Sequence, residues 1–83
     1  MPTVHRAGNL HFVVFVDDHG PPHVHVFADR AEAKILLGAQ DDRPELDWAR
    51  GFDRASLRRA LVEVMAHRAK LLAAWRRVHG AEA

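Results

Sequence analysis

Residues 10–37 read LHFVVFVDDHGPPHVHVFADRAEAKILL, in which three apolar segments alternate with turn-forming residues. Their β-branched and aromatic residues predict strands at Leu10–Val16, His23–Ala28 and Ala31–Leu37. The DDHGPP of residues 17–22 favours a turn, and Asp29-Arg30 fits the tip of a hairpin. Because both connections are short, these strands are expected to lie side by side as an antiparallel β-meander.

The segments on either side of residues 10–37 extend this meander. Thr3–Arg6 is a candidate short strand that pairs with the first of the three across a tight turn at Ala7-Gly8-Asn9. A polar loop, Gly38–Pro44, follows the third strand. Leu46 and Trp48 alternate within Glu45–Arg50, which is consistent with either a short edge strand or more loop. Trp48 and Trp75 are both expected in the core.

The hydrophobic period changes to that of a helix after Asp53, a favourable N-cap residue. Apolar residues at helical spacing predict a helix over Arg54–His79, ended by Gly80. This helix would be ~39 Å long at ~1.5 Å per residue, so a bend near Ala66–His67 is considered. The predicted fold class is α+β: a single domain over residues 1–83, with three or four antiparallel strands in about residues 3–50. One long amphipathic helix, residues 54–79, covers the sheet.

Composition limits the classes of protein that need to be considered. The chain has 83 residues, no cysteine, 48% hydrophobic residues and 28% charged residues, which is typical of a globular domain. Its longest apolar run is Phe12–Val16, far short of the ~20 residues that a membrane-spanning helix needs. The first residues, MPTVHRAGN, lack the apolar stretch of a signal peptide, so a cytoplasmic location without membrane association is expected.

Charge is distributed unevenly between the two parts of the chain. Residues 1–53 carry five Lys/Arg and nine Asp/Glu, whereas residues 54–83 carry seven Lys/Arg and two Glu, and the net charge is +1. Such an asymmetry is typical of a basic surface that meets RNA, DNA or an acidic protein. The alternative is a solvated helix in which arginine serves as a good helix former.

Four of the seven histidines lie within fifteen residues, at His11, His19, His23 and His25, and Asp17 and Asp18 lie among them. Alternate residues of a strand share a face, so His23 and His25 should be neighbours with Cα atoms about 6.5 Å apart. Pro21 and Pro22 stiffen the turn before them. The register that would place His11 on the same face is not determined by the sequence.

Three interpretations of this histidine turn compete. In the first, His23 and His25 are acid and base, Asp18 orients one of them and His19 assists. In the second, His19, His23 and His25, or Asp18 in place of His19, bind zinc or another first-row cation. In the third, the histidines are structural and bond to water or to nearby carbonyls.

Arg68 lies within the apolar stripe of the predicted helix, where an unpaired guanidinium would be costly to bury. It could form an ion pair with Asp17, Asp18 or Asp47, or it could reach the histidine turn and bind a phosphate together with His67 and Arg58. A bend of the helix near His67 would instead reset the register and move Arg68 out of the stripe. His67 by itself is expected on the helix surface.

Four strings resemble a small bacterial family, the domain of unknown function numbered forty-one sixty. They are MPT at the start, DDHGPPHVHV at Asp17–Val26, AEAKILL at Ala31–Leu37 and HRAKLLAAW at His67–Trp75. The family motif falls on Asp18, His19, Pro21, Pro22, His23, His25, His67, Arg68 and Trp75; Gly38–Gly51 matches least. Genes of the family often lie beside those of another small family, numbered twenty-four forty-two, in what looks like a toxin–antitoxin operon. The resemblance therefore implies a toxin–antitoxin context but does not imply a particular reaction.

The leading hypothesis is therefore a toxin that cleaves RNA without a metal or other cofactor. Asp18, His19, His23 and His25 would be its catalytic residues, with Arg68, His67 and Arg58 holding the substrate. An antitoxin of the neighbouring family would be its partner, and an exposed edge strand would favour a homodimer. The alternatives are a non-enzymatic module that binds protein or nucleic acid, and a small metal-binding protein built on His19, His23 and His25.

Overall fold

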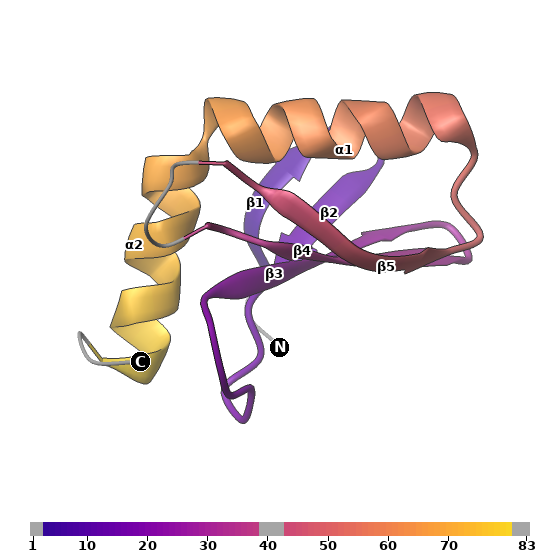
Figure 1. Ribbon diagram of the computed structural model, residues 1–83. Coiled ribbons are helices and arrows are strands. Elements are labelled where there is room, and N and C mark those ends of the chain that lie inside the picture. The colour runs from indigo at the N-terminus through magenta and orange to yellow at the C-terminus, as the bar shows by residue number, and fades with distance from the viewer. Residues whose placement is uncertain (1–2, 39–42, 81–83) are drawn as a thin grey trace.

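Five antiparallel strands follow one another across a single sheet in the computed structural model, which describes residues 3–38 and 43–80 (Figure 1). The strands are β1 (Thr3–Ala7), β2 (Leu10–Val13), β3 (His23–Ala28), β4 (Ala31–Leu36) and β5 (Glu45–Arg50). Two helices come last, α1 (Arg54–Ala66) and α2 (Arg68–His79). The α+β meander predicted from the sequence is thus confirmed.

Both helices cover the same face of the sheet, and α2 leaves the end of α1 at a steep angle (Figure 1). The strands supply alternate residues to this core because successive side chains of a strand point to opposite faces. Val24 and Val26 of β3, for example, lie opposite Ile35 and Ala33 of β4, and all four are fully buried. The helices add Ala60, Val64, Leu71, Leu72 and Trp75 to this layer. No helix in the described part of the chain is long and apolar enough to cross a bilayer.

The number of strands differs from the expected three or four because Glu45–Arg50 forms an edge strand, β5, paired with β4. Its Trp48 lies opposite Lys34, on the face that the helices leave open, and the residue is 38% exposed. The expectation of a core position for Trp48 is therefore wrong, whereas Trp75 is fully buried as expected. A short alternating segment specifies a face, but it does not specify whether that face is covered.

The strand predicted over Leu10–Val16 ends at Val13. Val14 still reaches the core, but Val16 is 72% exposed, because the chain has left the sheet to begin the turn that precedes β3. Val13 lies opposite His25 in the register of β2 with β3. Because β2 ends at Val13, His23 and Val24 at the start of β3 have no partner in β2. The start of β3 is therefore open to contact with residues 17–22.

The single long helix is replaced by two, which meet at His67. The molecule measures 34 × 27 × 19 Å, so a straight helix of ~39 Å would extend beyond the sheet that it has to cover. Asp53 caps α1 as predicted, since its Oδ1 accepts a hydrogen bond from the Ser56 amide at 2.7 Å. The break places Arg68 in the first turn of α2, where Nε donates to the Leu37 carbonyl at 2.7 Å and the guanidinium also bonds to Gly38.

Gly38 is expected to tolerate no side chain. Its φ is +64°, and a Cβ there would lie 2.2 Å from the backbone oxygen of Arg43. Gly8 has nearly the same φ, +59°, with nothing within 4 Å of a Cβ, and is a matched control. Gly8→Ala should lower the free energy of unfolding by about 1 kcal/mol through backbone strain alone, and Gly38→Ala by about 2–4 kcal/mol. Urea unfolding of both variants measures the difference; equal losses would contradict the close approach.

Candidate functional site

Asp18, His23 and His25 meet where the turn of residues 17–22 joins β3. Strand alternation places both imidazoles on the face opposite Val24 and Val26, as predicted from the sequence, and their ring centroids are 5.4 Å apart. The turn brings Asp18 back over them. Its Oδ2 lies 3.0 Å from Nε2 of His23 and 3.5 Å from Nε2 of His25. One carboxylate oxygen is therefore shared by two imidazole rings.

The second nitrogen of each ring is also engaged. Nδ1 of His23 donates to the carbonyl oxygen of Pro21 at 2.9 Å, which fixes the ring against the turn. Nδ1 of His25 donates to Oε2 of Glu32 on β4 at 3.3 Å. Oε1 of Glu32 in turn accepts from Arg50 of β5 at 2.8 Å, which fixes the position of the carboxylate. Both rings thus have a defined orientation, with Nε2 directed toward Asp18.

The three side chains differ in their access to solvent. The His23 side chain is only 2% exposed and packs against the buried ring of Trp75, with centroids 4.8 Å apart. His25 is 12% exposed, beside Phe15, and Asp18 is 22% exposed. A molecule from solution can therefore contact Asp18 and the edge of His25, whereas it reaches His23 only through these two. The two histidines thus differ in their access to solvent.

The other residues of the histidine turn are not part of this group. His19 is exposed. It is not among the three residues whose ligand atoms lie close enough to share a metal ion, which are Asp18, His23 and His25. His11 lies opposite Phe27 in the sheet register and so shares the face of His25, which answers the question left by the sequence. His11 lies two residues before Val13, the residue of β2 that pairs with His25.

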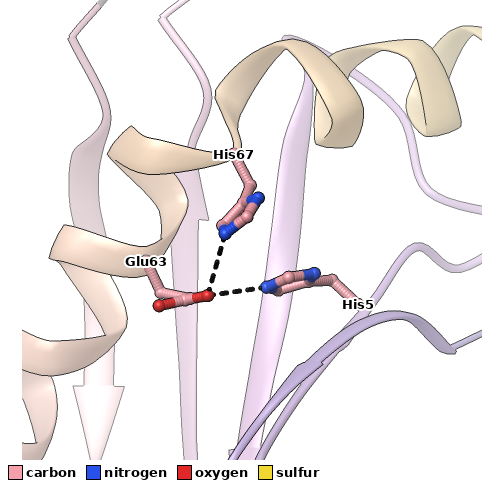
Figure 2. A group of neighbouring side chains, drawn as sticks. All are labelled: His5, Glu63 and His67. Atoms are coloured by element: carbon pink, nitrogen blue, oxygen red, sulfur yellow. Dashed lines mark hydrogen bonds and ion pairs between the residues drawn. The ribbon is translucent and has the colours of Figure 1, made fainter.

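The expected substrate-binding residues lie elsewhere. Arg68 bonds to the carbonyls at the end of β4, as described above, and neither of these contacts is with an aspartate. Arg58 is exposed on α1, beside an apolar groove. His67 joins a second group, His5, Glu63 and His67, which Figure 2 shows between β1 and the end of α1. The predicted site residues therefore fall into separate parts of the molecule.

The second group is centred on Glu63, whose Oε1 lies 2.8 Å from Nε2 of His5 and 3.1 Å from Nε2 of His67 (Figure 2). Lys70 donates to Nδ1 of His5 at 2.9 Å. Because an ammonium can only donate, Nδ1 of His5 is the acceptor and Nε2–H donates to Glu63. The hydrogen bond from Nε2–H of His5, aided by the charge of His67, holds the pKa of Glu63 below its ordinary value. Every donor here faces an acceptor.

Sequence reasoning missed Glu32 and His5. A signal for Glu32 was present, because a two-residue hairpin tip at Asp29-Arg30 places Glu32 opposite Phe27, diagonally next to His25. No comparable signal marks His5, which is 58 residues from Glu63 along the chain. Its position depends on how α1 lies on the sheet, which local patterns do not specify.

The model of one protein family, Domain of unknown function (DUF4160), matches residues 9–76. The chain belongs to this family. The match includes the histidine turn, α1 and most of α2, so the Asp18 group lies wholly within the DUF4160 domain, whereas His5 lies outside the matched residues. Neither a curated protein nor a solved structure matches the chain.

The Glu63 group should contribute stability that depends on pH. Its pKa is lowered in the folded protein, so the stabilisation is present at neutral pH and is lost as the pH falls through the glutamate range. Glu63→Gln keeps an acceptor for His5 and His67 but removes the charge. We expect it to lower the free energy of unfolding by less than about 1 kcal/mol at pH 7. The difference from wild type should vanish near pH 3 in urea titrations; a constant difference would contradict the charge assignment.

Proposed function

We propose that this DUF4160 chain is the toxin of a toxin–antitoxin pair and that it acts on RNA through the group Asp18, His23 and His25. The observation that supports this proposal most directly is the convergence of two oriented imidazoles on one partly exposed carboxylate oxygen. The Glu63 group shows the same convergence, and the Asp18 group differs from it because the second nitrogen of each of its two rings is held by a hydrogen-bond acceptor. The toxin–antitoxin gene arrangement that the family resemblance implies supplies the biological context.

The environment of the group suits a polyanionic substrate. Nε2 of His79 donates to the carbonyl of Phe15 at 3.0 Å, which ties the last turn of α2 to the segment leading into the histidine turn. That last turn carries Arg76 and Arg77, both exposed. These cations would favour long-range attraction of RNA to the molecule, although Arg77 itself lies on the side of α2 that faces β1.

Within the group, exposure suggests the division of labour. Asp18 and the edge of His25 would contact the scissile phosphodiester, and His25 would move the proton, since imidazole titrates near neutral pH. His23 would be a positioning residue: buried, held by Pro21, and fixing the orientation of Asp18. Glu32 would do the same for His25 from the other side.

Induction in bacteria tests the proposed toxin. Wild type should arrest growth, and Asp18→Asn and His25→Ala should not, because each removes one accessible member of the group. Purified protein should cleave RNA, and each variant should do so about 10²–10⁴-fold more slowly. Glu63→Gln, a carboxylate change in the other histidine group, should leave arrest and cleavage as in wild type. Circular dichroism checks that each variant folds.

Two results would contradict the proposal. A folded wild type that is harmless would remove the toxin function, and a non-enzymatic binding module would then be the better interpretation. Growth arrest by folded Asp18→Asn and His25→Ala that equals wild type would place the toxic activity outside the histidine turn.

A specific surface supports binding of a protein partner. An apolar groove of about 370 Å³ runs along α1, lined by Pro44, Leu57, Leu61, Val62 and Met65, with Arg54 and Arg58 at its edge. Val62 and Met65 are 59% and 58% exposed. Arg54 and Arg58 occupy the first helical turn and the next, where the helix dipole disfavours cations, and no acidic residue occupies that first turn. We propose that an acidic amphipathic segment of the antitoxin lies here.

Charge reversal tests this surface with a protein of the neighbouring family as the probe. Arg58→Glu should weaken the complex roughly tenfold and reduce its dependence on salt, because it opposes the acidic segment. Arg6→Glu makes the same change in charge on β1 and should leave the affinity unchanged. Equal affinities of the two variants, measured by titration calorimetry, would exclude the groove as the binding site.

A further inference from the structure

We infer that Asp18, His23 and His25 bind a first-row divalent cation such as Zn²⁺, with Oδ2 of Asp18 and Nε2 of each histidine as the ligand atoms. The inference concerns the centre of the proposed function, but it rests on side-chain geometry alone and not on toxicity. A metal-binding site here departs from the metal-independent chemistry expected from the sequence. Its ligands are those of the second set considered from the sequence, in which Asp18 takes the place of His19. With a cation bound, His25 would be a ligand and would no longer be the group that moves the proton.

The direction of the hydrogen bonds around His23 and His25 favours a cation at this site. The carbonyl of Pro21 and the carboxylate of Glu32 can only accept, so Nδ1 carries the proton in both His23 and His25. Nε2 of a neutral ring is then a lone pair, and both lone pairs face the oxygen of Asp18, which is another lone pair. A proton on Nε2 of one ring would complete its contact with Asp18 but would leave the lone pair of the other ring facing the carboxylate. A single cation satisfies all three atoms at once.

A proton on each ring would be the alternative. It would place two imidazolium ions with centroids 5.4 Å apart against one carboxylate, with His23 almost fully buried. Like charges at that separation repel, and burying a charge is costly even when it is paired. One shared cation avoids the repulsion between the rings.

The distances fit a metal. Ligands at about 2.0–2.2 Å from Zn²⁺ and at tetrahedral angles lie about 3.3 Å from one another. The two separations from Asp18 Oδ2 are 3.0 and 3.5 Å, and all three ligand atoms lie within 4.8 Å of each other. Only small movements of the rings would bring the three atoms to bonding distance of a common ion.

The groups that accept hydrogen bonds from Nδ1 of His23 and His25 have the arrangement typical of metal-binding histidines. Such a histidine almost always donates its other N–H to a backbone carbonyl or a carboxylate, which fixes the tautomer and the ring plane. His23 has the first kind of partner, Pro21, and His25 the second, Glu32, itself held by Arg50. Trp75 and Phe15 supply an apolar surround.

The Glu63 group offers the same residue types and lacks this property. Nδ1 of His5 accepts from Lys70, so Nε2 bears the proton that it donates to Glu63. A metal on Nε2 would displace that proton and leave a ring without any N–H. The adjacent ammonium would also repel the ion. Three protein ligands at the Asp18 site, by contrast, leave a fourth position for water or substrate, the arrangement of catalytic zinc sites.

Titration calorimetry of untagged protein with Zn²⁺ tests the inference. Wild type should bind one equivalent, and Asp18→Asn or His25→Ala should weaken or abolish that binding. Glu32→Gln, which changes only an outer partner, should weaken it about 10–100-fold. Glu63→Gln is the matched control and should bind as wild type does. In wild type labelled with ¹⁵N, Zn²⁺ should shift the Nε2 resonances of two histidines, which checks the ligands without any substitution.

The possible outcomes distinguish the metal site from the toxin function. No binding of Zn²⁺ by folded wild type would overturn the inference, as would equal effects of Asp18→Asn and Glu63→Gln, which would indicate scattered binding by surface histidines. Zinc binding at this site by a protein that does not arrest growth would sustain the metal site and reject the toxin. Growth arrest that depends on Asp18 in a protein that binds no Zn²⁺ would do the reverse.

Discussion

The two-residue period of β3 is the constraint on which the molecule depends. His23–Ala28 lies in the middle of the sheet, paired on both sides, with Val24 and Val26 in the core. A shift of one residue in its register would carry both valines out of the core and turn both imidazoles away from Asp18. The packing that stabilises the fold thus also fixes the position of His23 and His25. The two-residue hairpin to β4 sets the register that places Glu32 beside them.

Much of this arrangement follows from local patterns in the sequence. Turn residues and alternation predict three of the strands, Asp53 marks the start of α1, and alternation also puts His23 and His25 on one face. The missing parts depend on distant contacts. β5 is stabilised by pairing with β4 rather than by its own apolar content, and the fold of the turn that carries Asp18 over two rings has no periodic signature. The pairing of His5 with Glu63 likewise requires the packing of α1.

Arg68 illustrates how a residue that stands out in the sequence can have partners that the sequence does not indicate. An arginine inside an apolar stripe does need compensation, and it is half-buried in the structure. Two of its contacts are carbonyls, those of Leu37 and Gly38, at the end of β4. The break between α1 and α2 and this contact are linked: α2 begins at Arg68, so its first turn lies against the loop after β4. Through these contacts the residue joins the helix junction to the end of β4.

The two histidine–carboxylate groups show why residue types alone do not identify a site. Each contains two imidazoles and one carboxylate within metal-binding distance of one another. In one group, the ammonium of Lys70 makes Nδ1 of His5 an acceptor, and every hydrogen bond is then complementary. In the other, acceptors of Pro21 and Glu32 claim both Nδ1 protons and leave three lone pairs facing one another. The direction of the outer hydrogen bonds therefore separates a structural network from the site at which we infer a bound cation. That direction is set by strand register and by one lysine on α2, not by the histidines themselves.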